Sequence, residues 1–245
     1  MKNVSEESSA PGKCRALIVG ERYRKTTGAA LEDLGFHVIY MPDNPNVDTR
    51  VAGHADLSVL RTGEREIFLA PHLKGTEFEA SVRDIGYDII FPEITQGKEY
   101  PLDADFNIVF LGNNMLCGRK NRLAERLSSS HGFKRIAISQ GYARCSTCIV
   151  SENALITADS GIENAARTLG YDVLKIHPGF FRLPGFDYGF IGGSSFLLDG
   201  KLYFTGSISS HADKNVILSF LTHHNTAPVF LSSERAEDIG TVIVL

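Results

Sequence analysis

The chain repeats one short pattern: a helix-like stretch with one apolar face, a glycine followed by an aromatic residue, and a run of β-forming residues. Four copies are centred on Gly35, Gly86, Gly132 and Gly170, which lie 51, 46 and 38 residues apart, and a degenerate fifth copy covers Asn225–Leu231. Glycine readily adopts the left-handed conformation that ends a helix before a strand. The repeat therefore predicts successive helix-to-strand units of similar size.

A β-hairpin signal precedes each of the later helices. The clearest is Asp199-Gly200 between two apolar runs, because this dipeptide favours the tight turns of hairpins. The helices themselves are amphipathic, as the spacing of Phe78, Val82 and Ile85 indicates, and each needs a surface to cover its apolar face. The predicted hairpin strands are Leu57–Leu60 with Glu66–Ala70, Phe106–Leu111 with Met115–Cys117, Cys148–Val150 with Leu155–Ala158, and Ser195–Leu198 with Lys201–Thr205.

The first unit has only one predicted strand before its helix, Arg15–Val19, whereas the last residues, Gly240–Leu245, form a strand without a unit. Pairing these two strands completes the first unit. The sequence thus predicts an α/β ring of five β-β-α-β units, a five-bladed propeller with pseudo-fivefold symmetry. The alternative is an open, doubly wound α/β sheet. Gly20–Thr26 resembles a phosphate-binding loop in that context but lacks its second glycine.

Composition limits the class of protein. The 245 residues carry a net charge of −4, without the basic stripe expected of a nucleic-acid-binding surface. No apolar run reaches the ~18 residues of a membrane-spanning helix. Residues 1–13 lack the features of a signal peptide and are expected to be a flexible tail, followed by a single domain over residues 14–245. We therefore expect a cytoplasmic protein that binds neither nucleic acid nor membrane.

Two residue clusters have simple structural interpretations. The basic residues at 119, 120, 122 and 126 lie at helical spacing and are expected to form a solvated helix face. The cysteines are expected to be reduced in a protein without an export signal. Cys145 and Cys148 form a CxxC motif, which is a weak zinc signal without a second pair of ligands. The four cysteines are Cys14, Cys117, Cys145 and Cys148.

Five such units resemble the pentein fold of guanidino-group-modifying enzymes, over residues 14–245. His54–Leu60 resembles the His-x-Asp segment of arginine deiminases, and Gly141–Thr147 resembles their nucleophile loop. Phe190–Leu198 is similar to their Glu-Gly-Gly-Asp segment, but Ile191 replaces the glutamate and Ser194 the aspartate. The similarity is closest to an uncharacterised bacterial group of this fold. The fold also includes a non-enzymatic ribosome anti-association factor, so the resemblance alone does not imply catalysis.

The resemblance implies a set of site residues around the axis of the ring. Cys145 would be the nucleophile, His54 the general acid and base, and Asp56 a ligand of the substrate cation. Carboxylates at the starts of other strands would bind a planar cation by paired hydrogen bonds. The remaining candidate ligand-binding residues are Asp105, Asp187, Ser194 and Asp238.

The sequence leaves three functions open. The first is a pentein-fold protein that binds a small cationic guanidino or amino ligand without a complete recognisable catalytic triad. The second is a cysteine-dependent guanidino-group hydrolase or amidinotransferase. The third is a metal site formed by Cys145, Cys148 and His54, although no metal or other cofactor is expected. The oligomeric state is left open.

Overall fold

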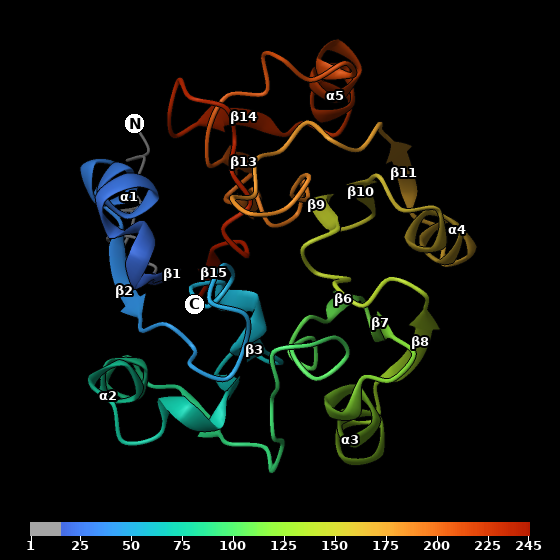
Figure 1. The fold of residues 1–245 in the computed structure, drawn as a ribbon. Coiled ribbons are helices and arrows are strands. Elements are labelled where there is room, and N and C mark those ends of the chain that lie inside the picture. The colour runs from blue at the N-terminus through green and yellow to red at the C-terminus, as the bar shows by residue number, and fades with distance from the viewer. Residues whose placement is uncertain (1–15) are drawn as a thin grey trace, which may run out of the picture.

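Five small three-stranded sheets surround a common centre in the computed structural model, which describes residues 16–245 (Figure 1). The predicted tail and Cys14 lie outside the described residues. The strands are β1 (Ala16–Gly20), β2 (His37–Met41), β3 (Val59–Arg61), β4 (Glu66–Leu69), β5 (Asp88–Ile90), β6 (Val109–Leu111), β7 (Asn114–Gly118), β8 (Lys134–Ile138), β9 (Thr147–Ser151), β10 (Ala154–Thr157), β11 (Asp172–Lys175), β12 (Ser195–Leu198), β13 (Lys201–Phe204), β14 (Ala227–Phe230) and β15 (Ile243–Val244).

Four units share one order: an antiparallel hairpin, a helix, and a third strand parallel to the second strand of the hairpin. The pairings confirm the predicted β-β-α-β order and contradict the open sheet, because the strands form five separate sheets rather than one. The ring is consistent with the predicted propeller. The helices, which lie on the outside in Figure 1, are α1 (Ala29–Asp33), α2 (Glu77–Asp84), α3 (Arg122–His131), α4 (Ser160–Thr168) and α5 (Lys214–His223).

The first unit is completed by the end of the chain. β15 pairs antiparallel with β1, with Leu17 opposite Val244, and β1 pairs in parallel with β2. The backbone N–H of Leu245 also donates to the carbonyl of Ala16 over 3.0 Å, an ordinary hydrogen-bond distance. This confirms the predicted closure of the ring by the C-terminal strand.

The hydrophobic core lies between neighbouring units rather than at the centre. Each of five apolar clusters joins residues of two adjacent units; one joins Ile18 of β1 to Ile67 of β4, and another joins Leu17 of β1 to Phe196 of β12. Burial of these side chains contributes about 25 cal/mol per Å² of apolar surface. Because the last cluster joins the fifth unit to the first, packing as well as strand pairing closes the ring.

The predicted helix ends are also confirmed. Gly35, Gly86, Gly132 and Gly170 all have a positive φ, between 72° and 92°. The degenerate fifth copy has Asn225 at this position, with φ of 54°. Asparagine is one of the few other residues that enter the left-handed region routinely. The fifth copy therefore follows the same backbone path without the glycine.

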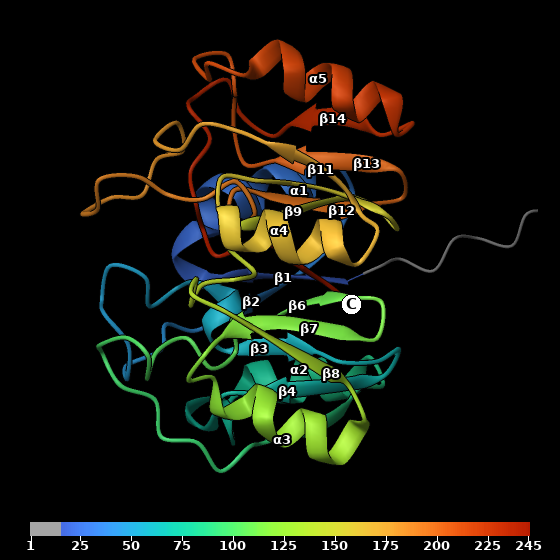
Figure 2. The same ribbon diagram turned by 90° about the vertical axis from the view of Figure 1, so that its right-hand side faces the viewer.

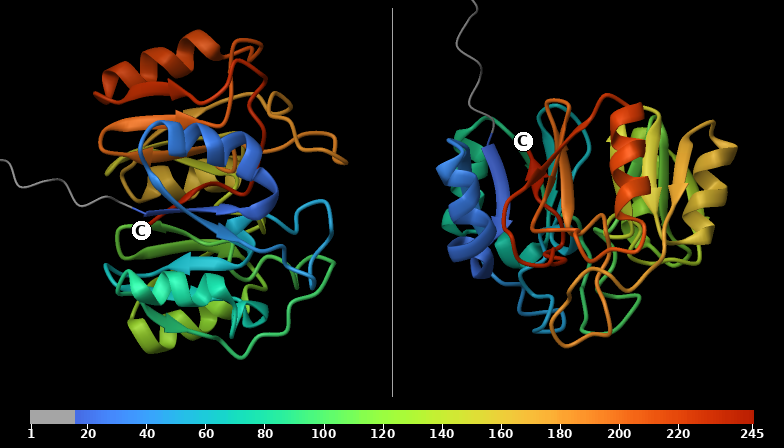
Figure 3. Two further views of the ribbon diagram at one scale, coloured as in Figure 1. Left: turned by 90° about the vertical axis from the view of Figure 1, so that its left-hand side faces the viewer. Right: turned by 90° about the horizontal axis from the view of Figure 1, so that it is seen from above.

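The long loops extend from one side of the ring, and the C-terminal residue lies on the other side (Figures 2 and 3). Each loop of the second to fifth units leads into the first strand of its hairpin, which lies next to the centre. This topology brings residues from distant parts of the sequence to one side of the ring. Within residues 16–245, no helix has the length and apolar character needed to cross a membrane.

Candidate active site

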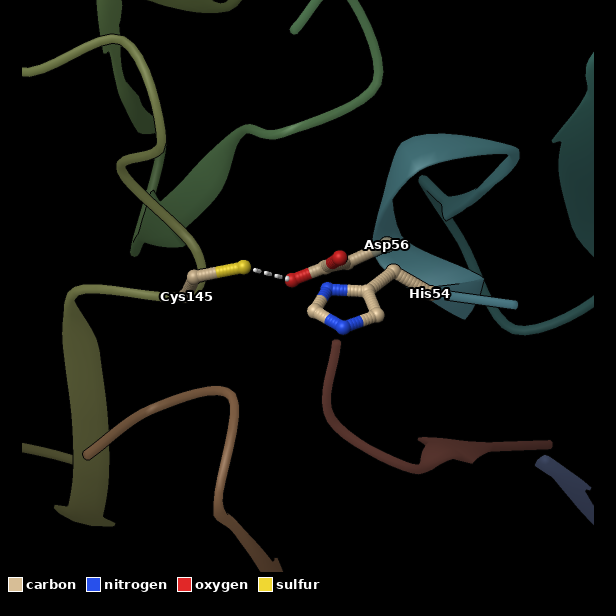
Figure 4. Close-up of side chains that lie close together, drawn as sticks. All are labelled: His54, Asp56 and Cys145. Atoms are coloured by element: carbon tan, nitrogen blue, oxygen red, sulfur yellow. Dashed lines mark hydrogen bonds between the residues drawn. The ribbon is translucent and has the colours of Figure 1, made fainter. Parts of the chain in front are cut away.

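Three buried side chains meet at the start of the inner strands. Cys145 precedes β9, whereas His54 and Asp56 lie at a 3₁₀ helix (Ala55–Leu57) that leads into β3. The Cys145 Sγ donates to Asp56 Oδ2 over 2.7 Å, and the His54 ring lies beside this pair (Figure 4). Potential ligand atoms of all three side chains lie within 4.8 Å of one another. Each residue is at most 3% exposed.

Asn107 holds the cysteine loop in place from the third unit. Its Oδ1 accepts the backbone N–H groups of Arg144 at 2.7 Å and Cys145 at 3.2 Å, and its Nδ2 donates to Cys145 Sγ over 3.3 Å. The N–H of Gly193 donates to the carbonyl of Cys145 from the other side. The thiol is therefore fixed by contacts to the second, third and fifth units.

Asp238, which lies on the segment before β15, adds a second carboxyl group to the site. Its Oδ2 accepts the N–H of Phe190 at 2.8 Å and its Oδ1 accepts the N–H of Gly240 at 3.0 Å. The same Oδ1 lies 3.9 Å from His54 Nδ1. The Asp238 side chain fills the space that a Cβ on Gly193 would occupy, so glycine is required there for close approach.

We expect Gly193→Ala to destabilise the protein by about 1–3 kcal/mol, because its methyl group overlaps the Asp238 carboxyl group and forces a buried segment to move. Urea unfolding measures this loss. Gly63→Ala is the matched control, since a Cβ at Gly63 meets only ordinary contact with Glu66. Equal stability of the two variants would contradict the close approach.

Burial dominates the electrostatics of the site. It lowers the pKa of His54 to about 3 and raises the pKa of Cys145 well above its usual value. It also raises the pKa of Asp56, and together with the negative charge of Asp56 it raises the pKa of Asp238 to about 7. Near neutral pH the free site therefore holds a neutral imidazole, a thiol and a carboxyl group that is changing its charge.

A cavity of about 520 Å³ gives access to these groups. His54, Cys145 and Asp238 line it, together with Asp103, whose Oδ2 accepts the hydroxyl of Tyr142 at 2.7 Å. A second hollow of about 300 Å³ has mainly apolar walls from inner strands such as β3, β6 and β12, with Asp56 and Arg144 among its lining residues. The cavity on the loop side has more charged residues in its lining than the second hollow, and it reaches the thiol.

The structure places the other expected site residues outside this cavity. Asp105 is completely buried, but both of its oxygens are taken by Arg122, so this expectation is corrected: it is a structural ion pair. Ser194 is also buried and donates to the carbonyl of Phe190 at 2.8 Å, and it does not line the cavity. Asp187 is exposed on the loop between two cavity-lining residues, without lining the cavity itself.

The basic cluster is not a single helix face. Only two of its members belong to α3, because the helix begins at Arg122, whose side chain binds Asp105. Arg126 donates to the carbonyl of Glu93. The cluster is thus partly used to hold the preceding loops, which spacing along the sequence does not reveal.

Among residues 16–245, two residue groups have a composition suited to a metal ion. The first is His54, Asp56 and Cys145, and the second is Asp172, His223 and His224 at the surface. Cys148 belongs to neither group; it lies in β9 and packs in the core between the fourth and fifth units. The CxxC pair therefore does not converge on His54, and the expected metal set of Cys145, Cys148 and His54 is corrected.

The chain shares the α/β fold of solved pentein structures. Solved structures with this fold include a mutant dimethylarginine dimethylaminohydrolase from Pseudomonas aeruginosa in complex with citrulline, with 11% identity, a TM-score of 0.55 and coverage of 95% of this chain and 99% of that chain. C. jejuni agmatine deiminase with substrate bound has 10% identity, a TM-score of 0.55 and coverage of 99% and 98%. Inosamine-phosphate amidinotransferase from Streptomyces griseus has 11% identity, a TM-score of 0.55 and coverage of 94% and 93%.

The sequence identifies the family more narrowly. The model of a family of unknown function, DUF6873, matches residues 18–243, and the chain belongs to that family. The comparison with curated proteins gave no match. At the low identities above, the structural neighbours define the fold and not the activity.

Proposed function

We propose that this protein binds a small guanidinium or amidinium cation in the 520 Å³ cavity. The observation that carries the proposal is a set of buried carboxyl groups without lysine or arginine partners. Asp103 and Asp238 line the cavity and Asp56 lies at the thiol; among the described residues, none of the three forms an ion pair with lysine or arginine. Asp56 Oδ1 and Asp103 Oδ1 have no hydrogen-bond partner at all.

Buried acceptors without a donor carry a large energetic penalty. A guanidinium or amidinium ion supplies several N–H donors in one plane together with a positive charge, which matches carboxylates that converge from different loops. The pentein fold supports this choice of ligand class, because the names of several proteins with this fold refer to compounds or reactions of guanidino or amidino groups. We also propose that the five units form a five-bladed propeller whose axis passes through this site.

Binding should depend on pH through Asp238. A cation binds the ionised carboxylate more tightly than the neutral acid, so affinity should rise with pH up to the pKa of about 7 and then level off. Below this pKa, the dissociation constant of methylguanidinium should increase by up to about tenfold for each pH unit that the pH falls. His54 does not contribute to this step, because its pKa of about 3 keeps it neutral throughout.

Titration calorimetry with methylguanidinium between pH 5.5 and 8.5 checks the pH dependence. Asp238→Asn should remove the increase in affinity between pH 5.5 and 7. Asp56→Asn measures how much the second buried carboxyl group contributes to that increase. Asp187→Asn is the control, because that exposed acid lies outside the cavity lining. Absence of binding by the native protein of every guanidinium or amidinium probe, at any pH, would overturn the proposed function.

A second candidate function is cleavage of a C–N bond in the bound cation. The hydrogen bond from Cys145 Sγ to Asp56, with the neutral His54 beside it, favours this function. The thiol proton moves to Asp56, Sγ bonds to the central carbon of the cation, and one C–N bond breaks as the leaving amine takes that proton. Water then attacks the same carbon with His54 as its base, and the C–S bond breaks as the proton held by His54 returns to sulfur. The product leaves in its protonated form and loses its extra proton to solvent.

A further inference from the structure

Three large aromatic side chains at the mouth of the cavity are exposed to solvent. Tyr100 is 48% exposed, Phe186 42% and Tyr188 40%, and all three line the cavity. They come from two loops, before β6 and before β12, that are far apart in the sequence. Exposed apolar side chains gathered at one place commonly mark a binding surface. Here they gather around the cavity that holds the buried carboxyl groups.

The aromatic walls continue from the mouth toward the thiol. Tyr100 lies next to Tyr142, with ring centroids 6.0 Å apart, and Tyr188 lies next to Phe190 at 6.2 Å. Both inner rings line the cavity as well, and the Tyr142 hydroxyl donates to Asp103. The two pairs give the cavity an aromatic lining between solvent and its acidic floor.

The basic groups at the mouth do not form a free anion site. Arg50 donates to Asp48 over 2.6 and 3.0 Å and to the carbonyl of Gly185 over 2.8 Å. Its guanidinium carbon also lies 4.1 Å from the centroid of the Phe186 ring. Arg50 therefore holds the Phe186 loop, and its charge is balanced by Asp48.

The remaining basic residue of the lining, Lys98, is exposed and next to the acidic Glu99. The lining as a whole has four acidic residues, Asp48, Glu99, Asp103 and Asp238, against the two basic ones. A ligand carboxylate at the mouth would meet negative charge and aromatic surface. A ligand with an uncharged apolar body would avoid the repulsion by these acidic residues and would pack against the aromatic surface.

We propose that the ligand is a guanidine or amidine with an aromatic or alkyl body and no carboxylate, rather than an amino acid such as arginine. This inference rests on the proposed function of the cavity. The cationic group lies at Asp103 and Asp238, and the apolar body packs between the Tyr100 and Tyr188 loops. Arg50 is a positioning residue that fixes Phe186 against this body.

Titration calorimetry with three probes tests the proposal: 3-phenylpropylguanidine, methylguanidine and arginine. The phenyl compound should bind at least about tenfold more tightly than methylguanidine, because it adds aromatic contact and apolar burial, and more tightly than arginine. Arginine binding as tightly as the phenyl compound would overturn this inference while leaving the proposed function intact. Absence of binding by all three probes would overturn the proposed function itself.

Variants at the mouth separate this role from general stability. Phe186→Ala and Tyr188→Ala should each weaken the phenyl compound by about 3- to 10-fold and leave methylguanidine unchanged. Phe230→Ala is the matched control, because Phe230 has the same 42% exposure as Phe186 but lies on β14 outside the cavity. Equal loss for both guanidines, or no loss for either, would contradict the placement of the apolar body.

Discussion

Incubation with 2-chloroacetamidine is expected to label Cys145 and no other cysteine of the described residues. The reagent combines an amidinium ion with a chloromethyl group, and attack by sulfur forms a thioether as chloride leaves. The cation would be held by the carboxyl groups around Cys145, which concentrates the electrophile at its Sγ. Cys117 and Cys148 are equally buried but do not line the cavity, so they serve as internal controls.

The charge of the reagent is the decisive comparison. Chloroacetamide carries the same electrophile on a neutral amide and should label Cys145 at least about a hundredfold more slowly, since it lacks the ionic contribution that orients the amidinium. Peptide mapping by mass spectrometry gives both rates. Cys145→Ala should remove the adduct, and Asp238→Asn should reduce the preference for the cation. Equal rates for the two reagents would contradict an acidic site around a nucleophilic thiol.

Deletion of residues 241–245 is expected to lower the free energy of unfolding by at least about 4 kcal/mol. Burial of Val242 alone contributes about 2 kcal/mol. Thr241 adds two hydrogen bonds, from its N–H to the carbonyl of Gly193 and from its hydroxyl to the carbonyl of Ser195, at about 1 kcal/mol each. The deletion also removes β15 from its pairing with β1.

A loss of this size should lower the melting temperature by about 10 °C in a domain of this length. Differential scanning calorimetry measures it. Leu245→Ala is the control, because it retains the strand and the backbone bond to Ala16 while removing one half-buried side chain. If the truncated and native proteins had the same melting temperature, the closing strand would not be needed for stability.

The order of the elements was predictable because it depends on local signals. Apolar periodicity, Asp-Gly turns and glycines after helices each act over a few residues, and they predicted strands such as Ser195–Leu198 with the observed bounds. Closure of the ring was predicted because the first unit lacked one strand and the end of the chain had a strand without a unit. The pairing of β15 with β1 confirms that step.

The site was less predictable because its contacts join distant residues. Asp105 follows the same pattern as a site carboxylate, but Arg122, 17 residues later, occupies its oxygens. Asn107 was not among the predicted site residues, because a neutral amide side chain is not typical of any one catalytic or binding role. Its position before an inner strand, equivalent to those of Asp56 and Cys145, was the available signal.

The arrangement of the units also explains why motif order along the chain is a poor guide to such a site. The second, third and fourth units each send residues before their inner strand to the same side of the ring, as Asp56, Asn107 and Cys145 illustrate. A substitution before the inner strand of one unit is therefore expected to disturb a site that residues of other units complete.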